Sequence, residues 1–522
     1  MRSPPIPNLP PKGRPRWVDD MACSFNLAHL FHQTPHLGAG SRLQGCFLPP
    51  CGLGGLPPGR CRASKRGNVA VAFGGDLVVA QHMRPVIDSV HVFENLQRTR
   101  PFQREGARTA NSATSPSPEA TASAFSWICL FIGTATASYG LFRLVTVQWP
   151  RGMPGDLNFY YQAARALLAN QPVYPPLTDI DQTNGFIYPP LSLVFFLPIA
   201  CLAPPTASLL FTLVSYGAMW GSTSLFLRRL TEDRGQKIDG PMVWASHLLT
   251  LGLGPTYMTL ACGQVNSIVL LLCVIFWIFL RRRPHLAGAA LALACWIKVY
   301  PVALFLAALM DLRSWRALKA AAFLGLILPL SLLWLIPLDL YAEYAVSIMP
   351  RVFRVGTTHV INQSIWAAAA RLEIPLAKVD AWHFFQLGLG GSYAQKGLLA
   401  VMSIAVALWL RKNFEVRSLT AFALQVALVP VLITLGWGHT FVLAMPLLLL
   451  LLVTAPAQTR LWRFGVLLIL LGLAWPSYSH VKLLDRGPSL LGHVFYSRYA
   501  LAVIAAAVLA LRLPECRSRR DG

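Results

Sequence analysis

Asp156 is the side chain whose position most favours chemistry, because it follows the first long apolar stretch of the chain in the segment GDLNFY at 155–160. A carboxylate can act as a general base and take the proton from an attacking hydroxyl group. An Asp before a helical run is also a common N-cap, and a solvated loop acid needs no function. Asp156 is therefore a candidate base at the edge of an apolar region, with helix capping as the alternative.

Lys298 is the second candidate, because apolar residues flank it on both sides in the segment ACWIKVYP at 294–301. An ionisable group inside an apolar segment is costly and by default indicates function. Its ammonium group could bind an anionic phosphate as a point charge. The alternative is a side chain that extends to the membrane surface, because Pro301 should break the apolar stretch from Leu286 to Met310.

Amide side chains stand at two predicted ends of apolar segments. Gln264 and Asn266 lie in the segment GQVN at 263–266, and Asn362 and Gln363 precede the apolar run that begins at Ile365. Such amides could bind substrate hydroxyl groups. Helix capping and hydrogen bonds between helices explain them equally well.

Three further features carry weaker signals. His439, between two apolar segments, could donate to a phosphate or cap a helix. Tyr188 precedes the Pro-Pro pair at which the chain re-enters apolar sequence. Asp179 and Asp181 form an Asp-x-Asp pair of the kind that can hold a metal, but the surrounding loop favours a solvated turn.

The elements that would position these residues are helices in a membrane. The chain has 522 residues, of which 55% are hydrophobic and 13% are charged, whereas a soluble domain has about 25% charged residues. Apolar stretches of about 20 residues, the length that spans a bilayer, recur from Phe125 onward. Because an open sheet cannot satisfy its backbone in lipid, the sequence predicts an all-α, polytopic integral membrane protein.

The distribution of charge predicts the topology. The formal net charge is +23, but no basic and aromatic stripe accompanies it, so we expect no nucleic-acid partner. Basic loops face the cytoplasm in most membrane proteins. The predicted cytoplasmic segments are 228–237, 281–283, 313–319, 411–412, 460–463 and the tail at 517–520. The turns predicted to face outward are 263–266, 339–396, 436–439 and 477–497, together with Asp156.

The predicted first span runs from Ala124 to Val147, and a short amphipathic helix from Leu157 to Leu168 should lie at the interface. The basic loops share one side if the piece from Tyr188 to Leu202 is short or re-entrant; the alternative is that one basic loop lies on the other side. With a short or re-entrant piece, about twelve helices span the membrane.

The ends of the chain differ from this core. Residues 1–120 are rich in Pro, Gly, Arg and Ser and contain neither a spanning run nor a signal peptide, so we expect disorder. A later translation start, for example at Met83, is the alternative. We divide the chain into this extension, a membrane domain at 121–513 and a basic cytoplasmic tail at 514–522.

Motifs for common cofactors are absent from the sequence. There is no P-loop, no dinucleotide fingerprint and no HExxH zinc motif. The ten cysteines show neither zinc-ligand spacing nor a disulfide framework. We expect no cofactor and no metal site, although a divalent metal stays open.

Taken in order, these residues resemble glycosyltransferase family 87, the polyprenyl-phosphate-mannose-dependent α-mannosyltransferases with the GT-C fold. The similarity runs from about Ala124 to the C-terminus. The positions that carry it are Asp156, Tyr174-Pro175, Tyr188-Pro189-Pro190, Gly263-Gln264-Val265-Asn266, Gly288, Lys298, Pro301, Asn362-Gln363-Ser364 and Trp437-Gly438-His439. Where the family has a second His after the Trp, this chain has Thr440, which leaves the role of a second His open.

The resemblance implies a GT-C-like bundle whose outer-face loops form the active site of a hexosyltransferase. Asp156 would activate an acceptor hydroxyl group, which attacks the anomeric carbon of a hexose, mannose by family, with inversion. The polyprenyl phosphate would leave, its charge offset by Lys298 and His439. The substrate-binding residues would be Tyr188, Gln264, Asn266, Asn362 and Gln363.

The implied partners are a polyprenyl-phosphate sugar, a glycolipid or glycan acceptor, and the lipid bilayer. The implied location is the plasma membrane (the bacterial inner membrane), with the active site on its extracytoplasmic face. Two other classes remain open from the residues alone. A polytopic transporter or a flippase of lipid-linked sugars would also need buried charges and broken helices, and a non-catalytic scaffold would tolerate substitution of Asp156 and Lys298.

Overall fold

The structure is a computed structural model that describes residues 118–148, 152–180, 184–235, 237–309, 314–373, 383–412, 414–474 and 490–513. All of them belong to one compact unit. The extension up to residue 117, Asp181, the turn at 477–489 and the tail at 514–522 lie outside the described residues.

The described residues are mostly helical, as the composition predicts. The N-terminal half contains the helices α3 (Pro118–Arg143), η3 (Leu144–Gln148), α4 (Gly155–Leu168), α5 (Leu177–Ile180), η5 (Pro190–Ser192), α6 (Leu193–Ala200), α7 (Pro204–Arg234), α8 (Gly240–Gly252), α9 (Gly254–Cys262), α10 (Asn266–Phe279), α11 (Pro284–Ile297) and α12 (Val302–Leu309).

The C-terminal half adds the helices α13 (Trp315–Ser331), α14 (Leu338–Glu343), η7 (Tyr344–Ile348), α15 (Met349–Val352), α16 (Ile365–Arg371), α17 (Leu389–Lys412), α18 (Phe414–Leu432), η9 (Gly438–Ala444), α19 (Met445–Thr454), η10 (Ala455–Ala457), α20 (Arg460–Ala474), α21 (Leu490–Tyr496) and α22 (Arg498–Leu511). Two short strands, β1 (Val355–Thr357) and β2 (Phe384–Gln386), pair antiparallel with Gly356 opposite Phe385.

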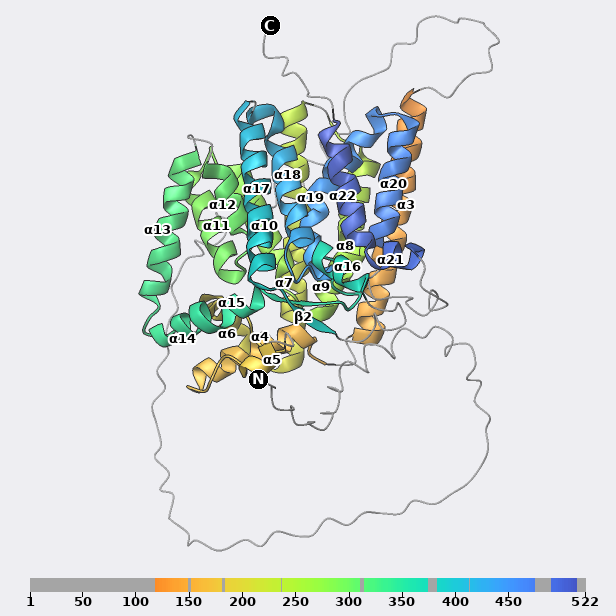
Figure 1. The fold of residues 1–522 in the computed structure, drawn as a ribbon. Helices are drawn as coiled ribbons and strands as arrows, with labels where there is room; N and C mark the ends of the chain where they lie inside the picture. Colours follow the sequence, from red (N-terminus) through yellow and green to blue (C-terminus); the bar gives the residue numbers. More distant parts are fainter. Residues whose placement is uncertain are drawn as a thin grey trace, which may run out of the picture. The chain divides into compact units, whose positions relative to one another are not determined.

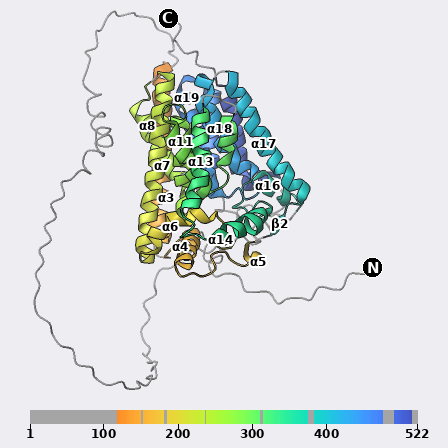
Figure 2. The same ribbon diagram turned by 90° about the vertical axis from the view of Figure 1, so that its left-hand side faces the viewer.

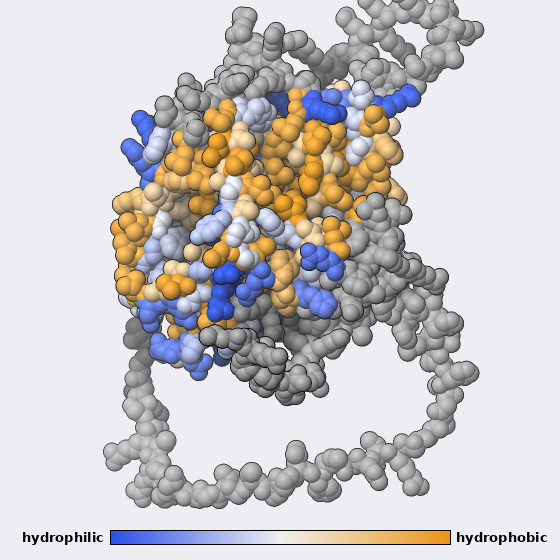
Figure 3. All heavy atoms as spheres, in the orientation of Figure 1, coloured by the Kyte–Doolittle hydropathy of each residue, from blue (hydrophilic) through white to orange (hydrophobic). Residues whose placement is uncertain are grey.

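Among the described residues, four helices are long and apolar enough to cross a membrane: Ser123–Thr146, Pro204–Arg234, Leu389–Trp409 and Gly438–Ala457. The pair α9 and α10 would make a fifth span, but it is bent by 120°. Large apolar side chains are exposed on these helices and in neighbouring segments, including Phe131 in α3 at 75% and Trp334 in the turn after α13 at 80%. Figure 3 shows hydrophobic side chains across the middle of one face, with hydrophilic ones toward its upper and lower edges. Such a surface suits lipid rather than water.

The described part of the chain confirms three local predictions. The first span lies within one residue of its predicted bounds. The amphipathic segment is α4, and the piece after Tyr188 is short, because η5 and α6 together cover Pro190–Ala200. The stretch around Pro301 is broken as well, since α11 ends at Ile297 and α12 begins at Val302.

Short elements gather at one end of the helical bundle. Figures 1 and 2 both place α4, α5, α6, α14 and β2 at that end, across the ends of the long helices. α4 packs against α6 and contacts α9. An amphipathic helix that buries one face and exposes the other is suited to a membrane surface.

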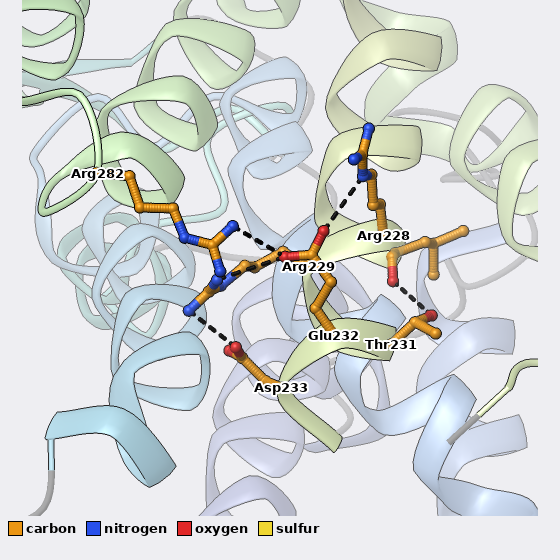
Figure 4. A network of polar contacts seen from close by, with 7 residues as sticks. Arg228, Arg229, Thr231, Glu232, Asp233 and Arg282 are labelled. Carbon is orange, nitrogen blue, oxygen red and sulfur yellow. Dashed lines mark hydrogen bonds and ion pairs between the residues drawn. The ribbon is translucent and has the colours of Figure 1, made fainter. Parts of the chain in front are cut away.

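The C-terminal turn of α7 carries a network of charged side chains, drawn in Figure 4. Glu232 accepts hydrogen bonds from Arg228 and Arg282, each at 3.2 Å, and Arg229 pairs with Asp233 at 2.8 Å. Exposed pairs of this kind add little stability. They do show that two predicted cytoplasmic segments, 228–237 and 281–283, lie side by side.

Candidate active site

Helix α4 presents Asp156 to the protein interior. The helix begins at Gly155, and its N-cap residue, Pro154, makes no side-chain capping bond. Asp156 is half-buried in the first turn, and its Oδ2 atom accepts a hydrogen bond of 2.7 Å from the amide Nε2 of Gln264. The carboxylate is therefore committed to a tertiary contact, and the capping alternative is wrong.

Gln264 is the centre of the cluster and is almost completely buried. Its Nε2 atom donates to Asp156 and, at 3.2 Å, to the hydroxyl group of Tyr188. Its Oε1 atom accepts from the hydroxyl group of Tyr160 and from Nζ of Lys298, each at 2.9 Å. These four bonds use the full capacity of a primary amide.

Gly263 brings α4 against this amide. It ends α9 with a left-handed φ of 69°, a conformation that glycine adopts without strain. A Cβ atom at this position would lie 2.6 Å from Cβ of Leu157 and 2.9 Å from Cβ of Pro154. The missing side chain therefore allows the backbone of the α9–α10 turn to touch the start of α4, next to Asp156.

Lys298 points into the cluster and not toward the membrane surface. Only 8% of it is exposed, and its Nζ atom lies 5.0 Å from the ring centroid of Tyr188 and 6.0 Å from that of Tyr300. Aromatic faces stabilise a desolvated ammonium group. The alternative in which Lys298 extends to the surface is wrong, and the break between α11 and α12 is the local structure that lets it turn inward.

Aromatic side chains form a wall beside the charged groups. Tyr160 stacks on Phe196 with ring centroids 4.3 Å apart and contacts Tyr188 at 5.0 Å. Tyr174 donates a hydrogen bond of 2.8 Å to the carbonyl oxygen of Tyr188. These ring contacts hold the half-buried Tyr188 next to Gln264 and Lys298.

His439, at the start of η9 in the C-terminal part of the chain, lies in the same cluster. Its carbonyl oxygen accepts hydrogen bonds from Thr259 at 2.9 Å and from Asn266 at 3.1 Å. The Oδ1 atom of Asn266 accepts in turn from Tyr300 at 3.1 Å. The imidazole is buried, and neither ring nitrogen has a hydrogen-bond partner among the described residues. This ring is therefore available to a ligand.

Asp156, Cys262 and His439 are the residues that could hold a metal ion. Their possible ligand atoms lie within 4.8 Å of one another. The ammonium group of Lys298 belongs to the same cluster and would repel a cation. The donor set therefore fits an anionic ligand better than a metal ion, and no chemical step below involves a metal.

Asn362 and Gln363, predicted as substrate-binding residues, lie in a separate network. Asn362 Nδ2 donates to the carbonyl oxygens of Thr357 at 3.1 Å and Thr434 at 2.9 Å. Gln363 Nε2 donates to two further carbonyl oxygens, and its Oε1 atom accepts from the backbone of Tyr499. An isolated bridge between Asn362 and Trp437 then ties this segment to the turn that carries His439.

The sequence interpretation missed Tyr160, Cys262 and Tyr300. Tyr160 stands four residues after Asp156, and on a helix that spacing places both on one face. Cys262 directly precedes the GQVN segment, and Tyr300 follows Lys298 by two residues. Helical periodicity could have identified Tyr160, whereas no signal in the sequence distinguished Cys262 from a packing cysteine.

Burial raises the pKa of the Asp156 carboxyl group, while the hydrogen bond from Gln264 and the positive charge of Lys298 lower it. Burial has the largest effect, so the pKa lies above the usual value for an aspartate. A raised pKa makes a carboxylate a better proton acceptor, which suits a general base. Its Oδ1 atom makes no contact among the described hydrogen bonds, which leaves a face open to a hydroxyl group.

The fold and the site together define an integral membrane protein with a carboxylate and a buried cation in one polar cluster. Residues 186–412 match the model of glycosyltransferase family 87. Over these residues the chain is similar to glycosyltransferase family 87, as the resemblance implied, and the match supports a glycosyltransferase activity.

Three similar curated proteins are all described as polyprenol-phosphate-mannose-dependent mannosyltransferases. A "polyprenol-phosphate-mannose-dependent alpha-(1-2)-phosphatidylinositol mannoside mannosyltransferase" of Mycobacterium tuberculosis is 28% identical over 56% of this chain and 69% of its own length. Its namesake from Mycolicibacterium smegmatis is 25% identical over 63% of this chain and 76% of its own length. A pentamannoside mannosyltransferase of Mycobacterium tuberculosis is 24% identical over 77% of this chain and 88% of its own length.

Proposed function

We propose that the protein transfers a mannosyl group from a polyprenyl-phosphate donor to a glycolipid acceptor of the phosphatidylinositol mannoside type. One observation carries the proposal: a half-exposed carboxylate, Asp156, lies in the same cluster as a buried cation, Lys298, at the membrane-surface end of an apolar bundle. The names of the relatives support the choice of donor and acceptor class.

In the proposed reaction Asp156 takes the proton of an acceptor hydroxyl group. The acceptor oxygen attacks the anomeric carbon, and the bond between this carbon and the phosphate oxygen breaks with inversion. The leaving polyprenyl phosphate gains negative charge, which Lys298 and the imidazole of His439 would stabilise. The unpartnered ring nitrogens of His439 support its share in this role.

The remaining site residues take different roles in this proposal. The half-buried ring of Tyr188 is available to a sugar, and Asn266 would act through the backbone of His439. Asn362 and Gln363 would hold the turn at 436–439 in place, because their amide groups already bind backbone atoms. We therefore assign them to support of the site, with no direct contact to substrate.

We also propose that about twelve segments cross the bilayer, with α4 and the active site on the extracytoplasmic face of the plasma membrane. The four spans, the bent pair α9–α10 and the shorter apolar helices support this arrangement. The broken stretch formed by α11 and α12 would complete a further crossing. The positive charge at 228–237 and 281–283 supports the orientation.

The experiment that tests this function is transfer of radiolabelled mannose from polyprenyl-phosphate mannose to phosphatidylinositol mannosides in membranes that contain the protein. Loss of a general base should reduce turnover about 10²–10⁴-fold, so Asp156→Asn should abolish the product. Asp339→Asn is the matched control, because Asp339 is exposed in the first turn of α14.

Two results would refute the proposal. Equal turnover by wild type and Asp156→Asn would exclude Asp156 as the base. Labelled donor that crosses the bilayer intact, without any product in wild type, would identify a transporter of lipid-linked sugars.

A further inference from the structure

Asp156 and Lys298 share one cluster without forming an ion pair. The ion pairs among the described residues all lie in the network of α7 and Arg282. Opposite charges attract strongly where the surroundings are apolar. Something must therefore keep the carboxylate and the ammonium group apart.

The amide of Gln264 bridges the two charged groups. Its donor end is 2.7 Å from Asp156 Oδ2, and its acceptor end is 2.9 Å from Lys298 Nζ. The reversed amide would place NH₂ against the ammonium group and oxygen against the carboxylate, so the two charges themselves fix its orientation. Tyr160 and Tyr188 take the two remaining bonds and brace the amide in place.

We propose that Gln264 is a positioning residue that insulates the base from the phosphate-binding cation. The neutral amide satisfies both charges and transfers neither to the other, so Asp156 stays free for the acceptor and Lys298 for the donor phosphate. This inference rests on the proposed function. It replaces the prediction that Gln264 binds substrate directly, because no hydrogen-bonding capacity of its amide is left over.

The insulating role predicts that the effect of Gln264 on phosphate binding depends on the charge of residue 156. Without the amide, the attraction between the charges would draw Lys298 onto Asp156 and away from phosphate. Loss of Gln264 should therefore weaken phosphate binding only while residue 156 carries a charge. A glutamine that merely supports packing would weaken binding equally whether or not that charge is present.

A double-mutant cycle separates the two roles. The measurement is binding of radiolabelled polyprenyl phosphate, the leaving group, to the purified full-length chain in lipid nanodiscs. Four proteins are compared: wild type, Gln264→Met, Asp156→Asn, and both together. Met has a similar length and can neither donate nor accept a strong hydrogen bond.

We expect Gln264→Met to weaken binding about tenfold in the wild-type background, the size of one charge-assisted contact. In the Asp156→Asn background the same substitution should change binding by less than about twofold, which is the limit of additivity. Gln425→Met is the matched control, because Gln425 is equally buried but bonds to Ala303 and Ser403, outside the cluster.

Equal losses in both backgrounds, or no loss in either, would overturn the role of Gln264. If Gln264→Met does not fold, Gln264→Glu serves instead: its carboxylate pairs directly with Lys298 and should weaken phosphate binding in both backgrounds, so unchanged binding overturns the proposal. A wild type that binds no polyprenyl phosphate would remove the donor assignment as well. A wild type that binds and transfers normally, with additive losses, would remove only the insulating role.

Discussion

At the scale of single residues, the site places unlike groups at fixed separations. Asp156 has one oxygen bound to an amide and a second with no contact among the described hydrogen bonds. Lys298 is buried against two tyrosine rings. The imidazole of His439 is buried with no hydrogen-bond partner in the described structure. Each of these groups carries a cost in the free protein that a bound substrate can relieve.

The pH dependence of transfer should report the raised pKa of Asp156. The base works only when it is deprotonated, so activity should fall as the pH decreases through this pKa, which lies above the usual value of about 3.9. Lys298 lowers this pKa, and Lys298→Met should therefore move the acidic limb to higher pH as well as reduce the rate. The measurement is kcat/KM for the acceptor across pH in both proteins.

The control for that prediction is Lys319→Met, a substitution in α13 that changes the same net charge outside the cluster. An acidic limb at the same pH in wild type and Lys298→Met would show that the lysine does not act on the carboxyl group of Asp156.

At the scale of elements, the positions at which helices break could be predicted from the sequence. The contacts that the ends of the broken helices make with each other could not. Proline and polar residues inside apolar runs predicted the breaks near Pro301 and after Tyr188, because these residues disrupt helical hydrogen bonding. Periodicity predicted α4 for the same kind of local reason. Contacts between distant segments, such as that of Gln264 with Asp156, depend on packing and leave no local pattern in either segment.

The same limit explains the two amides at 362 and 363. The sequence predicts an outward polar cluster at these positions, and the same pattern is expected of a substrate site and of a loop that bonds to its neighbour. In the structure the amide groups of Asn362 and Gln363 bind backbone atoms, which favours the supporting role proposed above. The apolar flanks of Lys298 and the place of His439 between two apolar segments made both of them candidates, and the structure places them in the same cluster as Asp156.

Gly263 is the position at which an element-level change should affect the chemistry. Gly263→Ala requires a left-handed φ that costs an L-residue about 1–2 kcal/mol, and its methyl group would push against Leu157. We expect a reduced kcat with a smaller change in donor binding, because α4 and Asp156 shift while Lys298 stays in place. Transfer assays over a range of donor concentrations provide the test.

Gly325→Ala in α13 is the matched control, since a Cβ atom there meets nothing within 4 Å. It should leave transfer unchanged. If Gly263→Ala keeps full kcat, the close approach of α4 to the α9–α10 turn is not needed for catalysis.

At the scale of the whole molecule, the surface around the middle of the helices is apolar, and the surface at their ends is polar. The apolar middle and the polar ends in Figure 3 match the composition of a protein that lies in a bilayer. The charged network at the end of α7 and the short elements around α4 belong to different ends of the bundle, since α7 connects them. The basic loops predict that the α7 end of the bundle faces the cytoplasm, and this orientation stays a prediction.

Epitope tags should confirm the orientation. A tag after Asn170, in the exposed turn that follows α4, should react with antibody on intact spheroplasts. A tag after Gly235, between α7 and α8, should react only after the membrane is permeabilised. The reverse pattern would place the active site in the cytoplasm and would refute the proposed topology.

The contact between Asp156 and Gln264 also has a consequence for biosynthesis. The ribosome delivers Asp156 more than one hundred residues before Gln264 and still earlier than Lys298, so α4 must wait at the membrane surface without the amide and the cation that later surround its carboxylate. Until those segments have been inserted, water can satisfy the carboxylate. The polar cluster can therefore close only late in biosynthesis, after α10 and the chain beyond α11 have been added.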